Sequence, residues 1–156
     1  MRSLSVFLFV LVTGFSAIGC DSDSSDNGPS DSERLVGNWI MSGVTDADGD
    51  QWDIFSAGFN SVVISFTQSG NYSIVIDSKL PDGDTTISGM YTVNEGTNSI
   101  ALATEVAGQS LNLNFTYAFS SDTQATFTAD PTTSTLLNVL LGTTLRGTVS
   151  LILTKI

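Results

Sequence analysis

The stretch that decides the fold lies at residues 62 to 76 and reads Val-Val-Ile-Ser-Phe-Thr-Gln-Ser-Gly-Asn-Tyr-Ser-Ile-Val-Ile. Every second side chain is large and apolar, both from Val62 to Phe66 and from Tyr72 to Ile76, which is the pattern of strands with one buried face. The Ser69-Gly70-Asn71 segment between them is a turn signal. The stretch therefore predicts an antiparallel β-hairpin with one apolar face.

The same texture continues through residues 34 to 156, where short segments rich in Val, Ile, Thr, Phe and Tyr alternate with turn signals. We predict strands at 37–45, 59–68, 71–78, 84–94, 98–104, 109–120, 122–129 and 143–155. Strands in simple meander order lose their exposed edges when the sheet closes on itself. The predicted fold class is all-β, an antiparallel eight-stranded up-and-down barrel, although alternation alone also fits a sandwich.

One face of these strands is predicted to form the core. It collects Val62, Ile64, Phe66, Tyr72, Ile74, Ile76, Ile87, Gly89, Tyr91, Val93, Leu111, Leu113, Phe115, Tyr117, Phe119, Val149, Leu151 and Leu153. The opposite face is mostly Thr, Ser and Asn. An eight-stranded barrel either holds one small ligand or is filled by its own side chains, and the sequence leaves both possibilities open.

One segment before the last strand predicts a short helix. Residues 133 to 142 begin with Thr133 and Ser134, either of which can cap a helix, and end with Gly142; Pro131 stands just upstream. The leucines of this helix are expected to plug a barrel end or to pack on the barrel wall. A mobile lid is the alternative interpretation.

The N-terminus predicts export. Arg2 precedes an apolar run from Leu4 to Phe15, which is too short for a spanning helix of about 20 residues, and small residues lead to the lone cysteine, Cys20. The segment resembles the lipobox of bacterial lipoproteins, although Ala17 stands where leucine is usual. The resemblance implies that residues 1–19 are a signal peptide and that Cys20 carries a diacylglyceryl group and an N-acyl chain. An uncleaved anchor or ordinary secretion stays open.

Residues 20–33 are predicted to be a linker. Positions 21 to 33 contain no apolar side chain and so cannot offset the entropy of ordering. Acidic residues directly after a lipidated cysteine resemble the surface-export signals of Bacteroidota lipoproteins, whereas in enterobacteria Asp at that place is associated with inner-membrane retention. We therefore expect a lipid-anchored protein of the cell envelope, at the outer membrane or cell surface. A plain soluble linker fits the same residues.

Charge and composition exclude some functions. The formal net charge is −11, and removal of the leader with Arg2 leaves four basic against 16 acidic side chains, or −12. Such a surface repels phosphate backbones, so nucleic-acid binding is excluded. The chain has no histidine, which removes Ser-His and Cys-His nucleophile pairs. We predict that the protein is not an enzyme.

Residues 34–156 resemble the bacterial lipocalin-like lipoprotein domains. The resemblance rests on Leu35-Val36-Gly37-Asn38-Trp39-Ile40, Ser69-Gly70-Asn71-Tyr72, Ser88-Gly89-Met90-Tyr91-Thr92-Val93 and Leu151-Ile152-Leu153-Thr154-Lys155. The Gly37-Asn38-Trp39 triplet matches the Gly-x-Trp signature of lipocalins. The resemblance implies that Trp39 closes the barrel base against a basic residue of the last strand, either Arg146 or Lys155.

Two binding functions follow from this interpretation. In the first, a small apolar ligand enters the barrel mouth against Phe66, Tyr72, Tyr91, Phe115 and Tyr117. In the second, the barrel is packed, and the protein is an envelope module that binds a protein or glycan through exposed loop residues, namely Trp52, Phe55 and Phe59.

An acidic loop predicts a possible calcium site. Asp46, Asp48, Asp50 and Asp53 could converge their oxygens on a hard cation. The loop departs from the EF-hand, because Gly49 stands at the fourth place and Ala57 at the twelfth. Asp and Gly are also the residues of ordinary exposed turns.

Overall fold

The computed structural model describes residues 28–79, 83–106 and 108–156. Its elements in chain order are α1 (Asp31–Leu35), β1 (Gly37–Asp46), β2 (Gly49–Asp50), α2 (Trp52–Gly58), β3 (Phe59–Phe66), β4 (Asn71–Ser78), β5 (Thr85–Asn94), the 3-10 turn η1 (Glu95–Thr97), β6 (Ser99–Val106), β7 (Gln109–Ser121), β8 (Gln124–Ala129), α3 (Pro131–Leu141) and β9 (Ser150–Lys155). No helix among these is both long enough and apolar enough to cross a membrane.

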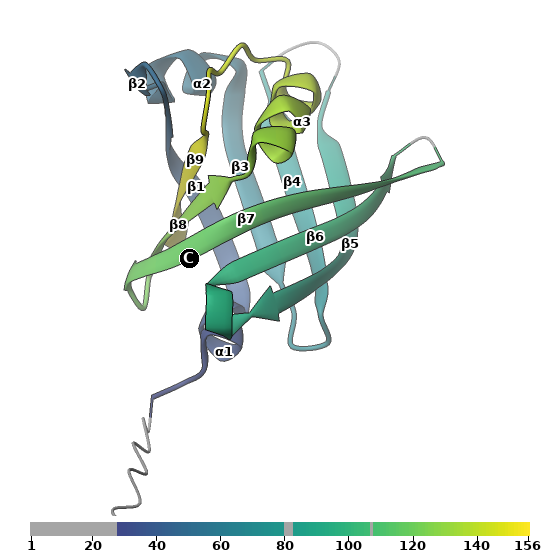
Figure 1. Cartoon of the computed structure of the whole chain (residues 1–156). Helices are drawn as coiled ribbons and strands as arrows, with labels where there is room; N and C mark the ends of the chain where they lie inside the picture. The colour runs from purple at the N-terminus through teal and green to yellow at the C-terminus, as the bar shows by residue number, and fades with distance from the viewer. Residues whose placement is uncertain (1–27, 80–82, 107) are drawn as a thin grey trace, which may run out of the picture.

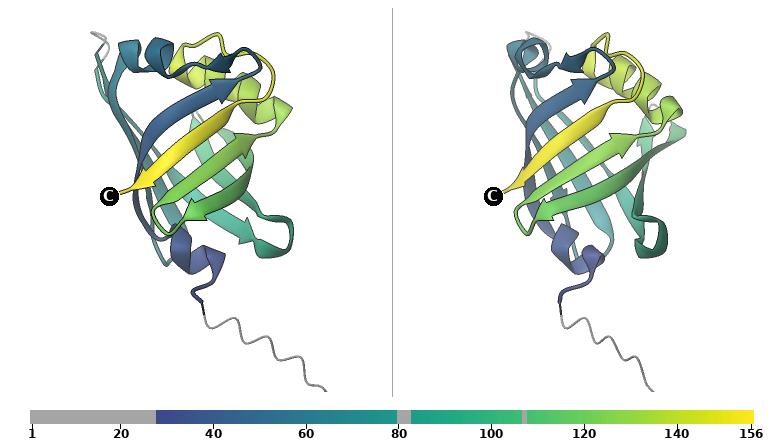
Figure 2. Two further views of the ribbon diagram at one scale, coloured as in Figure 1. Left: turned by 90° about the vertical axis from the view of Figure 1, so that its left-hand side faces the viewer. Right: turned by 60° about the vertical axis from the view of Figure 1, so that its left-hand side comes forward.

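The strands form a closed antiparallel barrel. Each strand from β3 to β9 pairs with its neighbour in the chain, β1 pairs with β3, and the additional pairing of β1 with β9 closes the sheet. The two-residue strand β2 pairs only with the end of β1. Figures 1 and 2 show the eight long strands around one interior, with α1 at one end and α2 and α3 at the other. The predicted fold class, an eight-stranded up-and-down barrel with a short helix before the last strand, is confirmed.

The predicted apolar face lines the interior. Val62, Ile64, Phe66, Tyr72, Ile76, Leu113, Phe115, Tyr117, Val149, Leu151 and Leu153 are buried, while Ile74, Ile87, Tyr91, Val93 and Phe119 are partly buried against them. Strands β6 and β8 add Ile100, Leu102, Ala125, Phe127 and Ala129 to the same core. One contiguous core therefore fills the barrel, as alternation on short antiparallel strands predicts.

The end of the barrel at α1 is its closed base. Trp39 is 0% exposed, and its indole Nε1 donates to the Leu35 carbonyl at 2.7 Å. Lys155 pairs with Trp39 in the β1–β9 register and places Nζ 5.3 Å from its ring. The basic partner of the tryptophan is thus Lys155 and not Arg146, whose side chain lies 3.6 Å from Asp48 at the other end.

Helix α1 begins within the segment predicted to be a linker. Residues 31 to 33 were expected to belong to a flexible tether, but they form the first turn of α1. Ser30 and Glu33 make a capping box there, in which each side chain bonds the backbone of the other residue. Ser32 also donates to Glu95 at 2.6 Å. Hydrogen bonds hold residues 31 to 33 in place, and a prediction based on counting apolar side chains does not detect such bonds.

Two further boundaries differ from the prediction. Helix α3 begins one turn earlier than expected, because Asp130 and not Thr133 or Ser134 caps it, with Pro131 in the first turn. Strand β9 starts at Ser150, whereas a strand was predicted from residue 143. Residues 143 to 149 form a loop because Asn138 bonds both the N–H and the carbonyl of Leu145. Gly142 ends α3 in the left-handed conformation, as predicted.

The base carries a pH-dependent contribution to stability through Tyr117. Burial, the hydrogen bond to Asp31 (3.1 Å) and the negative charges of Asp31 and Glu95 raise the pKa of Tyr117 from 10.0 to about 12. The unfolded chain loses this proton at a lower pH than the folded chain. The contribution of Tyr117 to the free energy of unfolding is therefore fully present below pH 10 and is lost as the pH rises toward about 12. We expect Tyr117→Phe to reduce that loss in denaturant titrations at a series of pH values. Part of the loss of stability at high pH should remain in this variant, since burial also raises the pKa of Tyr72 and Tyr91. A loss as large as that of the wild type would contradict the role given to Tyr117.

Candidate ligand site

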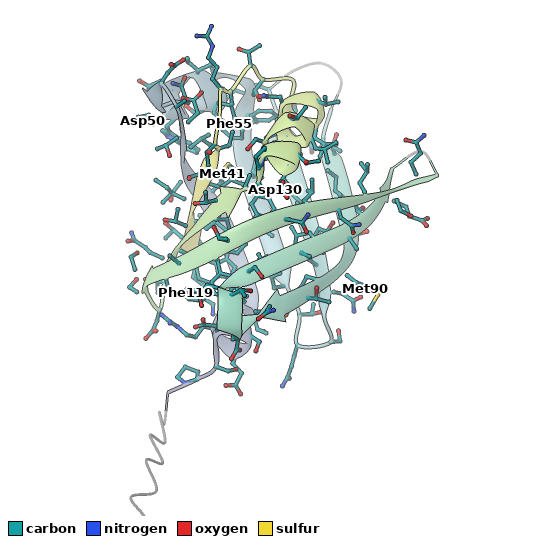
Figure 3. The ribbon with its side chains drawn as sticks, in the orientation of Figure 1. Met41, Asp50, Phe55, Met90, Phe119 and Asp130 are labelled. Atoms are coloured by element: carbon teal, nitrogen blue, oxygen red, sulfur yellow. The ribbon has the colours of Figure 1, made fainter. Side chains whose placement is uncertain are left out.

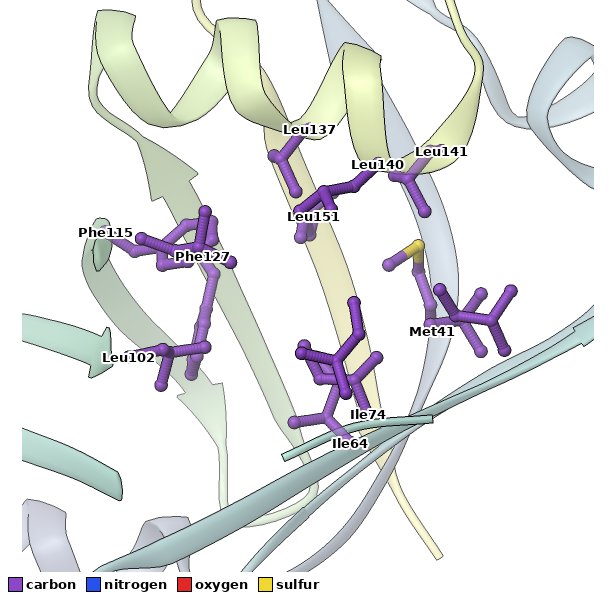
Figure 4. Close-up of a pocket in the computed structure, with 14 residues that line it drawn as sticks. Met41, Ile64, Ile74, Leu102, Phe115, Phe127, Leu137, Leu140, Leu141 and Leu151 are labelled. Atoms are coloured by element: carbon purple, nitrogen blue, oxygen red, sulfur yellow. The ribbon is translucent and has the colours of Figure 1, made fainter. Parts of the chain in front are cut away.

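Helix α3 lies at the end of the barrel opposite α1 (Figure 1). Three of its leucines, Leu137, Leu140 and Leu141, project from the helix toward Leu151 and Met41 on the barrel wall (Figure 4). They recur at helical spacing along one side of α3, so a single helix face closes the mouth. The expectation that these leucines plug a barrel end is confirmed.

Beneath α3 lies a small apolar cavity. Its lining comprises 14 side chains, all apolar: Met41, Val62, Ile64, Ile74, Ile76, Ile87, Leu102, Leu113, Phe115, Phe127, Leu137, Leu140, Leu141 and Leu151. Its volume is about 30 Å³, enough for one or two water-sized bodies. Ligand pockets measure roughly 300 to 1,000 Å³. With α3 in place, the interior has no room for an organic ligand.

The N-terminal end of α3 is fastened to the barrel by buried hydroxyls. Thr133 and Ser134 are among the few polar side chains that the described chain buries. Thr133 Oγ1 accepts from the Asn114 N–H of β7 at 2.7 Å, and Ser134 Oγ accepts from the Val149 N–H at 3.3 Å. These bonds satisfy backbone donors beside β7 and β9 and fix the first turn of α3 in place.

The C-terminal end of α3 is joined to a loop instead of a strand. Asn138 Nδ2 donates to the Leu145 carbonyl at 2.8 Å, and its Oδ1 accepts from the Leu145 N–H at 2.7 Å and from Thr143 at 3.0 Å. Half-buried Leu140 and Leu141 then supply the contact of this end with the barrel interior. The second half of α3 and the loop after it therefore form one unit. Apolar contact holds this unit over the mouth, together with the backbone bonds of Arg146 to Asp46 and Ala47 in the β1–β2 turn.

The five predicted ligand contacts do not lie together at the mouth. Phe115 lines the cavity, whereas Phe66, Tyr72, Tyr91 and Tyr117 do not. Phe66 and Tyr91 pack edge to face at 5.0 Å, and the Tyr91 hydroxyl donates to the Thr67 carbonyl in the β3–β4 turn. Tyr117 is bonded to Asp31 at the base. The structure therefore distributes these rings along the height of the barrel.

Several cavity residues were absent from the sequence prediction. Met41 on β1, Leu102 on β6 and Phe127 on β8 lie on predicted strands. Leu102 stands between two alanines and Phe127 between two threonines, and that alternation could have placed both on the inner face, whereas Met41 follows Ile40 and carries no such signal. The α3 leucines were predicted to plug the barrel, but no sequence pattern specified which strand residues they would meet.

In the acidic loop, the carboxylates of Asp46 and Asp50 accept hydrogen bonds from backbone N–H groups. Asp46 Oδ1 accepts from the Asp48 N–H and its Oδ2 from the Arg146 N–H, while Asp50 accepts from the Trp52 N–H. The Arg146 N–H is the largest cause that lowers the pKa of Asp46. No group of three or more His, Cys, Asp or Glu side chains that could hold a metal occurs among the described residues. The structure does not bring Asp46, Asp48, Asp50 and Asp53 together as a ligand set.

The aromatic residues after this loop form a packed cluster. They belong to helix α2, which the sequence analysis did not predict, and to the start of β3. Phe55 stacks against Trp52 at 5.9 Å and packs on Phe59 at 4.8 Å. The prediction of three exposed contacts is wrong for Phe55, which is 2% exposed, and Trp52 and Phe59 are partly buried. The exposed apolar residue of α2 is Ile54 (71%), and Figure 3 shows Phe55 and Asp50 at this end, far from Phe119 at the base.

Comparisons with known proteins add little to this geometry. No protein-family model and no curated protein matches the chain. One solved structure that matches is the siderocalin Ex-FABP, described as functioning through dual ligand specificities. It is 15% identical, the match covers 79% of this chain and 74% of that one, and the TM-score is 0.29. A superposition this loose carries no argument about ligands; the barrel is established by its own strand pairing.

Proposed function

We propose that the protein binds a small apolar ligand inside the barrel, and that the ligand takes the place of the α3 leucines when the helix lifts from the mouth. The observation that carries the proposal is the lining of the cavity, which is apolar on all sides and is closed at the mouth by one helix. A purely apolar cavity stays dry and accepts apolar guests.

The attachment of α3 supports this opening. Buried hydroxyls hold its first turn, whereas its second half meets the barrel interior through apolar contact alone. The loop that follows it is bonded to the exposed β1–β2 turn through Arg146 and not to the barrel interior. Displacement of Leu140 and Leu141 would enlarge the existing cavity without breaking any strand pair. The first turn can then remain in place as a hinge, and the barrel keeps its closed sheet.

A fluorescent apolar probe, N-phenyl-1-naphthylamine, tests the proposal. We expect saturable binding by the full-length protein. Leu140→Ala should tighten it, because less apolar contact must be broken to open the mouth. Val139→Ala is the matched control on the next residue of the same helix, since Val139 is 76% exposed and should leave affinity unchanged. Absence of saturable binding in both wild type and Leu140→Ala would overturn the proposal.

A packed interaction module is the second candidate. The small cavity favours it, as does the exposure of Ile54 and Val139 at the mouth end. A groove of about 230 Å³ between α2 and the loop after α3 is lined in part by Ile54, Phe59 and Leu145. If this candidate is correct, the probe is not taken up, and Ile54→Ser with Val139→Ser abolishes partner binding without changing the fold.

The proposal includes a lipid anchor on Cys20. The leader, the lone cysteine and the acidic stretch after it support this, and all three lie outside the described residues apart from the end of the stretch. Two acyl signals are needed for stable membrane binding, and the lipobox resemblance implies more than one chain. The described chain begins beside α1 at the base (Figure 2). An anchored protein would thus carry its mouth on the side away from the attachment point, in the cell envelope.

Cys20→Ala should abolish anchoring and leave the barrel folded, since the core lies entirely within residues 35 to 153. Detergent-phase partitioning and the mass of the protein purified from its native host measure the anchoring, and thermal melting measures the fold. An unmodified Cys20 in wild-type protein from that host would contradict the anchor.

A further inference from the structure

Tyr72 carries a buried hydroxyl without a partner. The residue is 2% exposed, and Tyr72 Oη is one of two buried side-chain polar atoms in the described chain that make no hydrogen bond; the other, Arg34 Nε, lies at the base. The Thr104 side chain lies beside the ring and opposes the rise in the pKa of Tyr72 that burial causes, while its hydroxyl donates to the Ser88 carbonyl at 2.9 Å. A buried polar group left unpaired costs free energy. The Tyr72 hydroxyl therefore favours any ligand that can accept a hydrogen bond from it.

The strand register places Tyr72 next to the cavity. Tyr72 pairs with Gly89, and Gly89 pairs with Thr104, so the three form one row across β4, β5 and β6. Ile74 and Ile87 form the adjoining inner pair on β4 and β5, and Leu102 is the adjoining inner residue of β6 on the other side of this row, opposite Tyr91; all three line the cavity. Gly89 leaves room for the tyrosine ring: a Cβ there would lie 3.0 Å from Tyr72 Cε1 and would clash with the Ala103 carbonyl oxygen.

We propose that Tyr72 Oη binds the polar end of the ligand, which is therefore a neutral amphiphile: an apolar chain that ends in a hydrogen-bond acceptor such as an ester or ketone. This inference rests on the proposed function. It specifies that the ligand has one polar end and how it is oriented in the barrel: the polar end lies beside β5 and the apolar chain extends toward α3.

The charges around the interior exclude an anionic head. The fully buried polar residues of the described chain are Thr104, Thr133 and Ser134, and none is charged. The cations nearest the interior, Arg34 and Lys155, lie at the base, where Arg34 pairs with Asp31 and Lys155 bonds the Arg34 carbonyl. A carboxylate would have to be buried without a cation, which is far more costly than burying an ester. Burial also raises the pKa of Tyr72, so its hydroxyl remains a donor at neutral pH.

Displacement of the fluorescent probe from the full-length protein by decane, methyl nonanoate and nonanoate tests the inference. We expect methyl nonanoate to bind about three- to tenfold more tightly than decane, the gain of one added hydrogen bond, and nonanoate to bind most weakly at neutral pH. In Tyr72→Phe the ester should lose its advantage while decane keeps its affinity. Tyr91→Phe is the matched control, because the Tyr91 hydroxyl bonds Thr67, and it should keep the wild-type ratio.

The outcomes separate the two proposals. Decane binding with the same ester-to-decane ratio in wild type and Tyr72→Phe would overturn the role of Tyr72 and leave the proposed function intact. Tighter binding of nonanoate than of decane and methyl nonanoate would also overturn the role of Tyr72 and leave the proposed function intact. If no compound displaces the probe, or the probe itself does not bind, both proposals fail. Tyr72→Phe should melt at or above the wild-type temperature, because it removes an unpaired buried hydroxyl; a purely structural role would lower that temperature.

Discussion

Replacement of Trp39 by alanine is expected to lower the free energy of unfolding by roughly 3–5 kcal/mol, the range for removal of a large aromatic side chain from a core. The indole is fully buried, its Nε1 bonds the Leu35 carbonyl, and Lys155 covers its ring. The substitution removes the buried ring, its bond to Leu35 of α1 and its contact with Lys155 of β9. Because small domains are stable by only about 5–15 kcal/mol, the variant should be close to unfolding at physiological temperature.

Two other variants test whether the loss of stability in Trp39→Ala arises from the contacts at the barrel base. Trp39→Phe keeps most of the ring and loses the bond to Leu35, so it should cost less than Trp39→Ala. Trp52→Ala removes the second tryptophan, which is only partly buried, and should also cost less. Urea unfolding followed by circular dichroism measures each free energy. A Trp39→Ala protein as stable as wild type would refute the base assignment.

Replacement of Leu137 by alanine is expected to cost roughly 2–5 kcal/mol, because the side chain is deeply buried and its removal enlarges the cavity under α3. The same change should not weaken binding of the apolar probe, since the ligand fills the space that the leucine leaves. Loss of stability with retained or tighter binding is the combination that distinguishes a plug from ordinary core.

Val139→Ala is the control for Leu137→Ala, since it lies two residues further along α3 and points to solvent. An exposed substitution of this kind should change stability by no more than about 0.5 kcal/mol. Equilibrium unfolding and probe titration of the same samples give both quantities. If Leu137→Ala lost stability and probe affinity together, the leucine would be part of the binding surface and not a plug.

The strands were predictable because their signals are local. The alternation from Val62 to Ile76 and the turn at Ser69 to Asn71 determine which side chains face inward, and short turns fix antiparallel pairing. Trp39 could be assigned to the base through the Gly37-Asn38-Trp39 triplet. The choice of Lys155 over Arg146 needed the β1–β9 register, which depends on two strands that are far apart in the sequence.

The site was harder to predict because height along a barrel is not a local property. Phe115 and Tyr117 share a face, yet one lines the cavity and the other is bonded to Asp31 at the base. The tilt of the strands sets these heights. Helix α2, the early start of α3 and the loop after α3 were missed for another reason. Asp50, Asp130 and Asn138 respectively support them through side-chain bonds to the backbone, which hydrophobic periodicity does not register.

A distance between α3 and the barrel wall tests the central claim most directly, namely that the interior accepts a ligand when α3 lifts. Spin labels at Val139→Cys and Met90→Cys in a Cys20→Ser background report it, because both native side chains are exposed and Met90 lies on β5. The account predicts that saturating methyl nonanoate shifts the distance distribution to a new, resolved position and that nonanoate does not. A distribution that stays unchanged while methyl nonanoate is bound would contradict it.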